Sequence, residues 1–259
     1  MVFPAICSLY YQQDDLYAIS ITGILTVAVG YPLWWFFRRN DELNIKDGFF
    51  IAVFGWVIIS AVSAVPYVIH GSIPSFTDAF FESVSGFTTT GSSVMTNIQE
   101  AAPSLLLWRS LIQWLGGMGI IVLSLAILPF LGVGGIQLYK AEVPSPVPDK
   151  LTPRLSDSAK ILWVVYAGIT FVEIIFLLAG GMPLFESVCH ALTTLPTGGF
   201  SPKNASIAHY DSLYFDMVIT VFMLLAGINF SLHYQLLKGR PLAFWKDTEC
   251  RIFLGTVLV

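Results

Sequence analysis

Five stretches of the chain are apolar over the length of a membrane-spanning helix, and they constrain the fold more than any other feature. A helix needs about 20 apolar residues to cross the hydrocarbon layer of a bilayer. The stretches are Leu16–Phe37, Gly48–Val68, Leu105–Leu131, Ile161–Leu178 and Leu213–Leu237. Mean hydropathy is +0.73 and 12% of the residues are charged, against about 25% in a typical soluble domain. The sequence therefore predicts an all-α, polytopic membrane protein.

The positively charged residues gather in three segments that alternate crossings place on one side of the membrane. The three groups are Arg38, Arg39 and Lys46 after the first stretch; Lys140, Lys150, Arg154 and Lys160 after the third; and Lys238, Arg240, Lys246 and Arg251 after the fifth. Only Arg109 and Lys203 lie elsewhere. Loops rich in Lys and Arg stay on the cytoplasmic side. We therefore expect the connections after the second and fourth stretches to lie outside the cell.

Composition and motifs argue against several other classes of protein. The net charge of −4 provides no basic surface for nucleic acid. Cys7, Cys189 and Cys250 are far apart and form no CxxC pair, so they indicate neither a zinc site nor a disulfide framework. No HExxH, GxSxG or Walker-type phosphate-binding pattern occurs, and GVGGIQ at Gly132–Gln137 fails the GxGxxG pattern. We expect neither a nucleic-acid partner nor an enzyme.

The connection after the second apolar stretch has a pattern of its own, IPSFTDAFFESVSGFTTTGSSV. Ser75 followed three residues later by Asp78 is typical of a helix start, and the segment after it is long enough for a short helix that cannot span. A turn rich in Thr and Gly follows. Non-helical backbone at membrane depth is tolerated only where it is buried in protein or lines a watery cavity. The pattern predicts a re-entrant hairpin that lines a pore.

This pattern is repeated in the connection after the fourth stretch. FESV at Phe81–Val84 recurs at Phe185–Val188. Pro183 is well placed to start a second short helix, which should end near Thr194, and PTGG then takes the place of TTGS. With three extra residues allowed, Thr90–Gly91 is matched with Thr197–Gly198. The repeat predicts two units of helix, re-entrant loop and helix.

The repeat divides the chain into five predicted parts. They are an N-terminal helix region (1–46), a first unit (47–139), a cytoplasmic linker (140–160), a second unit (161–238) and the start of a third unit (239–259).

The two Thr-Gly loops suggest a chemistry. Glycine permits backbone angles that turn successive carbonyls toward one axis, and rings of such oxygens can replace the water shell of a potassium ion. A helix C-terminus carries about half a negative charge, and each short helix would point that end at the ion. Backbone oxygens would be the ligands, with Thr hydroxyls as helpers.

Four segments together carry a resemblance to a known family. They are SGFTTTGSS, the stretch QWLGGMGIIVLSLAILPFLGVGGIQLYKAE from Gln113 to Glu142, PTGGFS, and FWKDTECR. The chain resembles the membrane subunit of bacterial Trk-type potassium uptake systems, the TrkH family. In that family four units, built as in potassium channels, surround one pore in a single polypeptide. The resemblance implies that potassium is held by Thr89, Thr90, Gly91, Pro196, Thr197 and Gly198, mainly through backbone carbonyls.

The resemblance carries further expectations. It implies potassium uptake across the bacterial inner membrane, with potassium as the transported substrate and no organic cofactor. It also implies a cytoplasmic nucleotide-binding regulatory subunit as partner, and a homodimer as the assembly. Two of the four units are present in this sequence, so we expect the chain to be the N-terminal portion of a longer protein, or else two copies to associate. A non-conducting structural subunit or inactive half-transporter is the alternative.

Individual residues leave alternatives open. Pro196 removes an amide donor and restricts Leu195, although its carbonyl stays available. The glycines of LGGMG indicate close helix packing or a hinge. Arg109 is expected to snorkel or to pair with a carboxylate of a short helix. His190 has no second ligand at metal spacing and is expected to be a lone polar residue of a packed helix.

Four acidic residues also have open roles. Glu173, within an apolar stretch, is expected to be hydrogen-bonded or to face a vestibule. Asp78, Glu82 and Glu186 are candidates for drawing cations to the outer mouth, although the electrostatics of a helix start explain Asp78 equally well.

Overall fold

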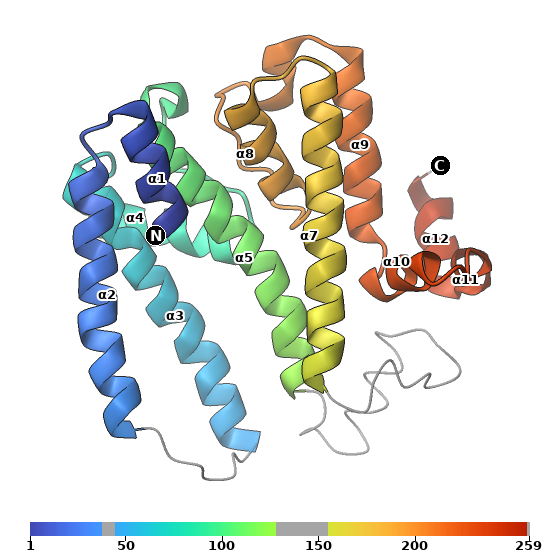
Figure 1. The fold of residues 1–259 in the computed structure, drawn as a ribbon, viewed down its shortest axis with the longest axis horizontal. Coiled ribbons are helices and arrows are strands. Elements are labelled where there is room, and N and C mark those ends of the chain that lie inside the picture. Colours follow the sequence, from blue (N-terminus) through green and yellow to red (C-terminus); the bar gives the residue numbers. More distant parts are fainter. Residues whose placement is uncertain (38–44, 128–154, 258–259) are drawn as a thin grey trace.

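The computed structural model describes residues 1–37, 45–127 and 155–257, and every regular element in these ranges is a helix. Figure 1 shows long helices running side by side, with one group of short helices packed toward their upper ends and a second group at the lower right. The predicted all-α fold is therefore confirmed. The predicted linker and the GVGGIQ segment at Gly132–Gln137 fall largely or wholly outside the described residues.

The long helices correspond to the predicted apolar stretches. They are α2 (Leu16–Phe37), α3 (Ile45–His70), α5 (Pro103–Ile127), α7 (Leu155–Ala179) and α9 (Leu213–Gly227). The short elements are α1 (Val2–Tyr11), α4 (Phe76–Phe87), η1 (Ile98–Glu100), α8 (Leu184–Thr194), η3 (Ser206–Tyr210), α10 (Phe230–Leu237), α11 (Leu242–Lys246) and α12 (Thr248–Val257).

Among the described residues, three helices are long and apolar enough to cross a membrane, namely α2, the Val53–His70 part of α3, and the Ala159–Ala179 part of α7. Most of their apolar side chains face outward, which suits lipid rather than water. Helix α5, with 25 residues, is about 37 Å long but carries Arg109 and Gln113 in its first half, and its assignment as a span stays a prediction.

The fifth predicted stretch is not one straight helix. Helix α9 ends at Gly227, and α10 leaves it at an angle of 99°. Asn229 caps the new helix, since its side-chain oxygen accepts a hydrogen bond from the Ser231 N–H at 2.9 Å. Residues 227–229 interrupt the helical hydrogen bonds of an otherwise apolar sequence, and hydropathy alone does not detect such a break. Taken together, α9 and α10 are long and apolar enough for one span, so the stretch predicted from Leu213 to Leu237 is bent rather than straight, and its crossing of the membrane stays a prediction.

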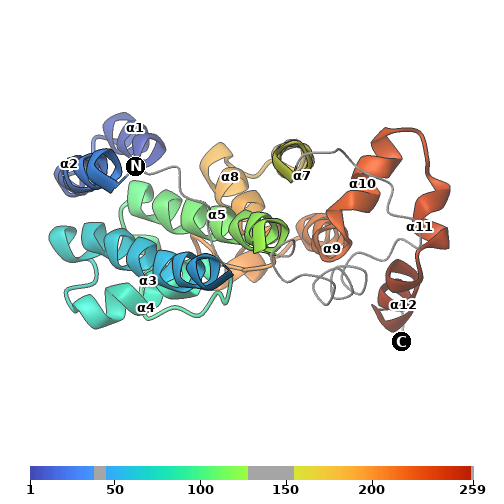
Figure 2. The same cartoon turned by 90° about the horizontal axis from the view of Figure 1, so that it is seen from below.

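Helix α5 lies between the two halves of the described structure and belongs to the core of both. Its residues Leu105, Trp108 and Ile112 join the cluster formed with α3 and α4, while Met118 joins the cluster formed with α7 and α9. Figure 2, viewed along the long helices, shows α5 between α3 and α4 on one side and α7 and α8 on the other. One helix thereby contacts both units.

The glycines of LGGMG pack closely, as predicted. Backbone of Phe87 fills the space beside Gly116. A Cβ atom on Gly117 would lie 2.5 Å from the Pro196 side chain, and one on Gly119 would lie 2.9 Å from Trp56. Any side chain at these positions would push α5 away from its neighbours.

Candidate functional site: two re-entrant loops

The first short helix begins as the sequence predicts. The Ser75 hydroxyl accepts a hydrogen bond from the Asp78 N–H at 3.4 Å. Helix α4 ends at Phe87 and leads directly into the segment that we call loop 1 (residues 88–97). Helix α8 starts after Pro183, ends at Thr194 as predicted, and leads into loop 2 (residues 195–205). Each loop therefore starts at the C-terminal end of a short helix.

Loop 1 leaves its helix by a tight turn. The Thr89 N–H donates to the Gly86 carbonyl at 3.0 Å, and the Thr90 N–H donates to the Ser85 carbonyl at 2.9 Å. Thr89 and Gly91 both have positive φ, 56° and 75°. This left-handed backbone is ordinary for glycine and rare for threonine. The turn thus has left-handed residues at alternate positions.

Loop 2 makes the same turn. The Thr197 N–H donates to the Thr194 carbonyl at 2.8 Å, and the Gly198 N–H donates to the Thr193 carbonyl at 3.0 Å. Here φ is positive at Thr197 and Gly199, again 56° and 75°. The two loops share one backbone conformation in spite of their different sequences.

This shared turn corrects the predicted register of the repeat. Thr89 corresponds to Thr197 and Gly91 corresponds to Gly199, so the matching of Thr90–Gly91 with Thr197–Gly198 was wrong by one residue. The helix starts agree with the new register, because Ser75 and Pro183 are both N-cap residues. From the sequence alone, Gly91 was matched with Gly198 because that glycine directly follows Thr197, as Gly91 follows Thr90.

The FESV segment consequently lies one helical turn further from the helix start in α4 than in α8. In the structural register Glu82 corresponds to His190, and Glu186 corresponds to Asp78. A shift of four residues keeps a side chain close to the same face of a helix, so the sequence repeat conceals the change. Glu82 is fully buried and the Glu186 side chain is 16% exposed. Glu82 is therefore not placed to draw cations to an outer mouth, which corrects that candidate role.

The predicted ligand residues lie in and next to these turns. Thr90 and Thr197 are exposed, while Thr89, Gly91 and Gly198 are half-buried. The Thr88 and Thr90 hydroxyls are hydrogen-bonded to each other at 2.8 Å. Pro196 is buried, and its carbonyl accepts a hydrogen bond from the Thr197 hydroxyl at 2.7 Å. A carbonyl oxygen has two lone pairs, so the Pro196 oxygen keeps one more position for a ligand.

The two loops touch each other. The Gly198 carbonyl oxygen occupies the space in which a Cβ atom on Gly91 would stand, and the side chain of Gln113 fills the space beside Gly198. The Thr-Gly segments predicted from two distant parts of the sequence are therefore brought together, with a residue of α5 directly behind them.

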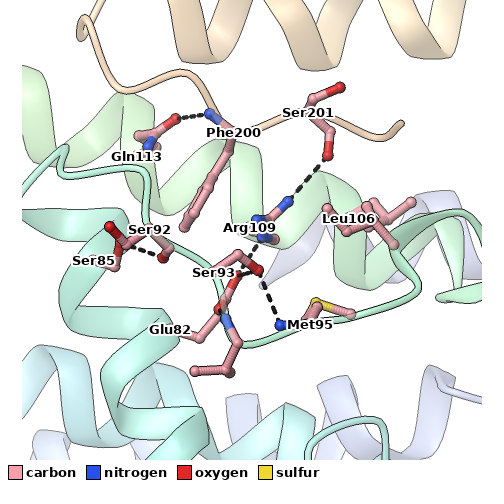
Figure 3. Close-up of polar contacts among 12 residues, drawn as sticks. Glu82, Ser85, Ser92, Ser93, Met95, Leu106, Arg109, Gln113, Phe200 and Ser201 are labelled. Carbon is pink, nitrogen blue, oxygen red and sulfur yellow. Dashed lines mark hydrogen bonds and ion pairs between the residues drawn. The ribbon is translucent and has the colours of Figure 1, made fainter. Parts of the chain in front are cut away.

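Arg109 forms a buried ion pair with Glu82 of α4, as one of the two alternatives predicted. The Arg109 Nε and Glu82 Oε1 atoms are 2.5 Å apart, and both side chains are almost completely buried. Glu82 also accepts hydrogen bonds from the Ser93 hydroxyl at 3.0 Å and from the Val94 N–H at 2.9 Å. Figure 3 shows this carboxylate between the arginine and the part of loop 1 that follows the turn, at Ser93.

The same arginine also holds loop 2. Its Nη1 donates to the Ser201 carbonyl at 3.0 Å, and its guanidinium lies 3.7 Å from the centre of the Phe200 ring. Gln113 reaches the same segment, because its Oε1 accepts a hydrogen bond from the Phe200 N–H at 3.1 Å. Figure 3 shows both side chains of α5 directed at loop 2.

Sequence reasoning did not find Gln113 or Gly199. A signal for Gln113 was present, since it lies four residues after Arg109 on an apolar helix and must share its face. A signal for Gly199 was the double glycine after Thr197, because a second glycine allows the left-handed residue to fall at either position.

A second polar cluster lies at the start of α8. Lys203 and Glu186 form an ion pair at 2.8 Å, and the Tyr210 hydroxyl donates to Glu186 at 2.6 Å. Burial acts to raise the pKa of Glu186, but the hydrogen bonds from Lys203 and Tyr210 hold this pKa below its ordinary value. His190 lies 3.3 Å from the Tyr210 hydroxyl, and burial lowers the pKa of His190 to about 4. The imidazole is thus neutral at physiological pH.

Glu173 is neither exposed nor hydrogen-bonded within the described residues. The side chain is 0% exposed, and neither carboxyl oxygen has a hydrogen-bond partner there. The Thr194 hydroxyl is close by but donates its hydrogen to the His190 carbonyl at 2.9 Å. The expectation of a hydrogen-bonded or vestibule-facing carboxyl therefore stays a prediction.

These features define a class of protein: a polytopic membrane protein in which units of helix, re-entrant loop and helix join at their turns. A family model described as TrkH, a cation transport protein, matches residues 16–258. The chain belongs to the TrkH family of cation transport proteins. Its predicted place in the bacterial inner membrane is confirmed with the family, and this family is one of transporters rather than enzymes.

Individual relatives agree with this assignment. The Trk system potassium uptake protein TrkH of Salmonella typhimurium is 42% identical over 262 residues, which cover 100% of this chain and 54% of that protein. The protein of the same name from Escherichia coli K12 is 41% identical, with 98% and 54% covered. The crystal structure of the potassium transporter TrkH from Vibrio parahaemolyticus superimposes with a TM-score of 0.86 at 35% identity, covering 98% of this chain and 52% of that one. The chain spans about half the length of these relatives.

Proposed function

We propose that the two loops form two walls of a potassium-selective filter, in a channel-like protein that takes up potassium across the inner membrane. The membrane potential would drive the cation inward. The observation that carries this proposal is the common turn of loops 1 and 2, which meet at Gly91 and Gly198. Relatives named as potassium uptake proteins support the choice of ion.

The backbone of the turns supports ion binding by carbonyl oxygens. In an ordinary extended strand successive residues face opposite sides. Left-handed residues at alternate positions, such as Thr89 and Gly91, reverse this alternation and allow neighbouring carbonyls to face one side. A row of carbonyl oxygens can replace the hydration shell of a potassium ion. The C-terminal ends of α4 and α8 add partial negative charge at the start of each turn.

The proposed ligands are those predicted from the sequence, with one addition. They are Thr89, Thr90 and Gly91 in loop 1 and Pro196, Thr197 and Gly198 in loop 2, and the structural register adds Gly199 as the counterpart of Gly91. Further walls would come from further units, in keeping with the relatives, which are about twice as long.

The proposed partners follow from the family. We propose a cytoplasmic nucleotide-binding regulatory subunit that docks on the inner loops, and a homodimer as the assembled transporter. The name "Trk system", which the relatives carry, is consistent with a transporter that works with other components. The proposed division into units, with a third unit starting near residue 239, belongs to the same proposal.

Growth of a host that lacks potassium uptake tests the proposed function. The natural polypeptide that carries this chain should restore growth at limiting potassium, and Gly91→Ser should abolish the rescue. A side chain at Gly91 would meet the Gly198 oxygen and require a strained backbone. Gly55→Ser is the matched control, since nothing lies within 4 Å of a Cβ atom there. Equal growth with and without the polypeptide would favour a non-conducting structural subunit.

A further inference from the structure

Two side chains of α5, Arg109 and Gln113, form hydrogen bonds behind the loops that ion binding by backbone carbonyls does not by itself require. Arg109 and Gln113 lie four residues apart on α5, and both are buried, with 2% and 0% exposed. Residues at this spacing share one face of a helix. That face is directed at loop 2 and at Glu82 of α4, which in turn binds loop 1 (Figure 3).

The ion pair joins equivalent parts of the two loops. Glu82 accepts hydrogen bonds from Ser93 and Val94, which follow the turn of loop 1. Arg109, paired with Glu82, donates a hydrogen bond to the carbonyl of Ser201, which follows the turn of loop 2. The path from Val94 through the ion pair to Ser201 is therefore a continuous chain of hydrogen bonds. Its length depends on the guanidinium, whose planar fork donates in two fixed directions.

Gln113 adds a second contact at the level of the turns. Its Oε1 holds the Phe200 N–H, and its side chain fills the space beside Gly198. Gly198 in turn touches Gly91 of loop 1. The side chain thus limits how far loop 2 can withdraw from loop 1.

From these contacts we infer that Arg109 and Gln113 are positioning residues, which fix the separation of the first two filter walls and thereby set the discrimination between potassium and smaller cations. The inference rests on the proposed function, because it concerns the same loops. A ring of oxygens replaces the hydration shell of one ion better than that of another only while its oxygens hold their spacing. Looser walls should admit sodium without stopping the passage of potassium.

Two substitutions loosen the network in different ways. Arg109→Lys keeps the buried positive charge beside Glu82 but replaces the fork by a single ammonium, which cannot reach both Glu82 and Ser201 in the same geometry. Gln113→Met keeps the size of the side chain and removes its hydrogen bond to Phe200. Arg251→Lys and Gln99→Met, both at exposed positions, are the matched controls.

The test is the ratio of potassium to sodium permeability, measured electrically on the natural polypeptide reconstituted in lipid vesicles, together with its maximal potassium flux and thermal unfolding. We expect Arg109→Lys and Gln113→Met to lower the ratio at least tenfold while the maximal potassium flux stays within a few-fold, and the controls to keep both. If Arg109→Lys does not fold, the uncharged substitution Gln113→Met decides.

The outcomes separate this inference from the function on which it rests. Folded variants with an unchanged permeability ratio would overturn the positioning role and leave the proposed function intact. A fall in maximal flux with an unchanged ratio would do the same, because it would indicate general structural damage. An unvaried protein that does not prefer potassium would overturn both.

Discussion

The carbonyl oxygen of Gly198 occupies the space in which a Cβ atom on Gly91 would stand. The two glycines belong to loops that lie more than 100 residues apart in the chain, yet loop 2 could not keep its course if loop 1 carried a side chain at Gly91. Contact of this kind makes the two turns one structural unit.

Gly198→Ala should disturb the site from the side opposite Gly91. Its Cβ atom would overlap the side chain of Gln113, which is fully buried and has no room to withdraw. Overpacking of this kind costs about 1–3 kcal/mol. Thermal unfolding in detergent should therefore occur at a lower temperature, and potassium flux should fall. Gly168→Ala, at a helical glycine with nothing within 4 Å of its Cβ position, should be neutral or slightly stabilising. Equal effects of the two substitutions would contradict the contact.

Glu82→Gln and Glu186→Gln should reduce stability by very different amounts, although each glutamate is the second residue of an FESV segment. Removal of the Glu82 charge leaves Arg109 buried without its counter-ion, and breaking a buried pair costs about 3–5 kcal/mol. The pair of Glu186 with Lys203 is partly exposed, and such pairs contribute about 1 kcal/mol or less. Thermal unfolding of the two variants provides the comparison. Similar losses would show that the two glutamates are structurally equivalent after all.

Stability should fall as the pH falls from about 6.5 to about 4, in part because of His190. Burial lowers the pKa of this imidazole from 6.5 to about 4 in the folded protein. In this interval the unfolded chain binds a proton that the folded protein does not bind, so acid favours unfolding. His190→Gln should therefore give a flatter profile of unfolding temperature against pH between these values. Glu186 loses its own stabilising effect at lower pH, because its pKa lies below the ordinary 4.5. Parallel profiles of the two proteins would contradict the role of His190.

Glu173→Gln should leave stability unchanged or raise it. The carboxyl is completely buried, and neither oxygen has a hydrogen-bond partner within the described residues. A neutral amide of the same shape removes the cost of burying an acid, whether the acid stays charged or has to take up a proton on folding. Glu173→Lys should be strongly destabilising, because it places a cation in the same surroundings. A large loss of stability in Glu173→Gln, measured by thermal unfolding, would show that the carboxylate charge is compensated in the protein.

Local patterns predicted much of the fold because their causes are local. The start of α4 at Ser75 and that of α8 at Pro183 depend on residues within one helical turn, and both were predicted. In the described part of the chain, the three helices that are long and apolar enough to cross a membrane overlap stretches that hydropathy predicted. The Thr-Gly turns of loops 1 and 2 were found for the same reason, since left-handed backbone calls for glycine or a short polar residue close by.

Long-range contacts explain what the sequence did not predict. The register of the repeat depends on backbone hydrogen bonds such as that from Gly198 to Thr193, which the letters FESV do not encode. The break after Gly227 depends on the side chain of Asn229 rather than on hydropathy. The role of Gln113 depends on Phe200, which lies far along the chain. No spacing within one helix could reveal that pair.

Gly116 and Gly117 are adjacent in sequence, and each allows a different segment to approach: the backbone of Phe87, the last residue of α4, lies against the first, and Pro196 of loop 2 lies against the second. Successive residues of an α-helix point about 100° apart around its axis. The end of α4 and the start of loop 2 therefore approach α5 from directions that differ by little more than a right angle. In a ring of four equal walls each wall turns by a quarter of a circle from the last. The rotation of about 100° between successive residues of α5 is thus close to the quarter turn that would separate two neighbouring walls of the proposed filter.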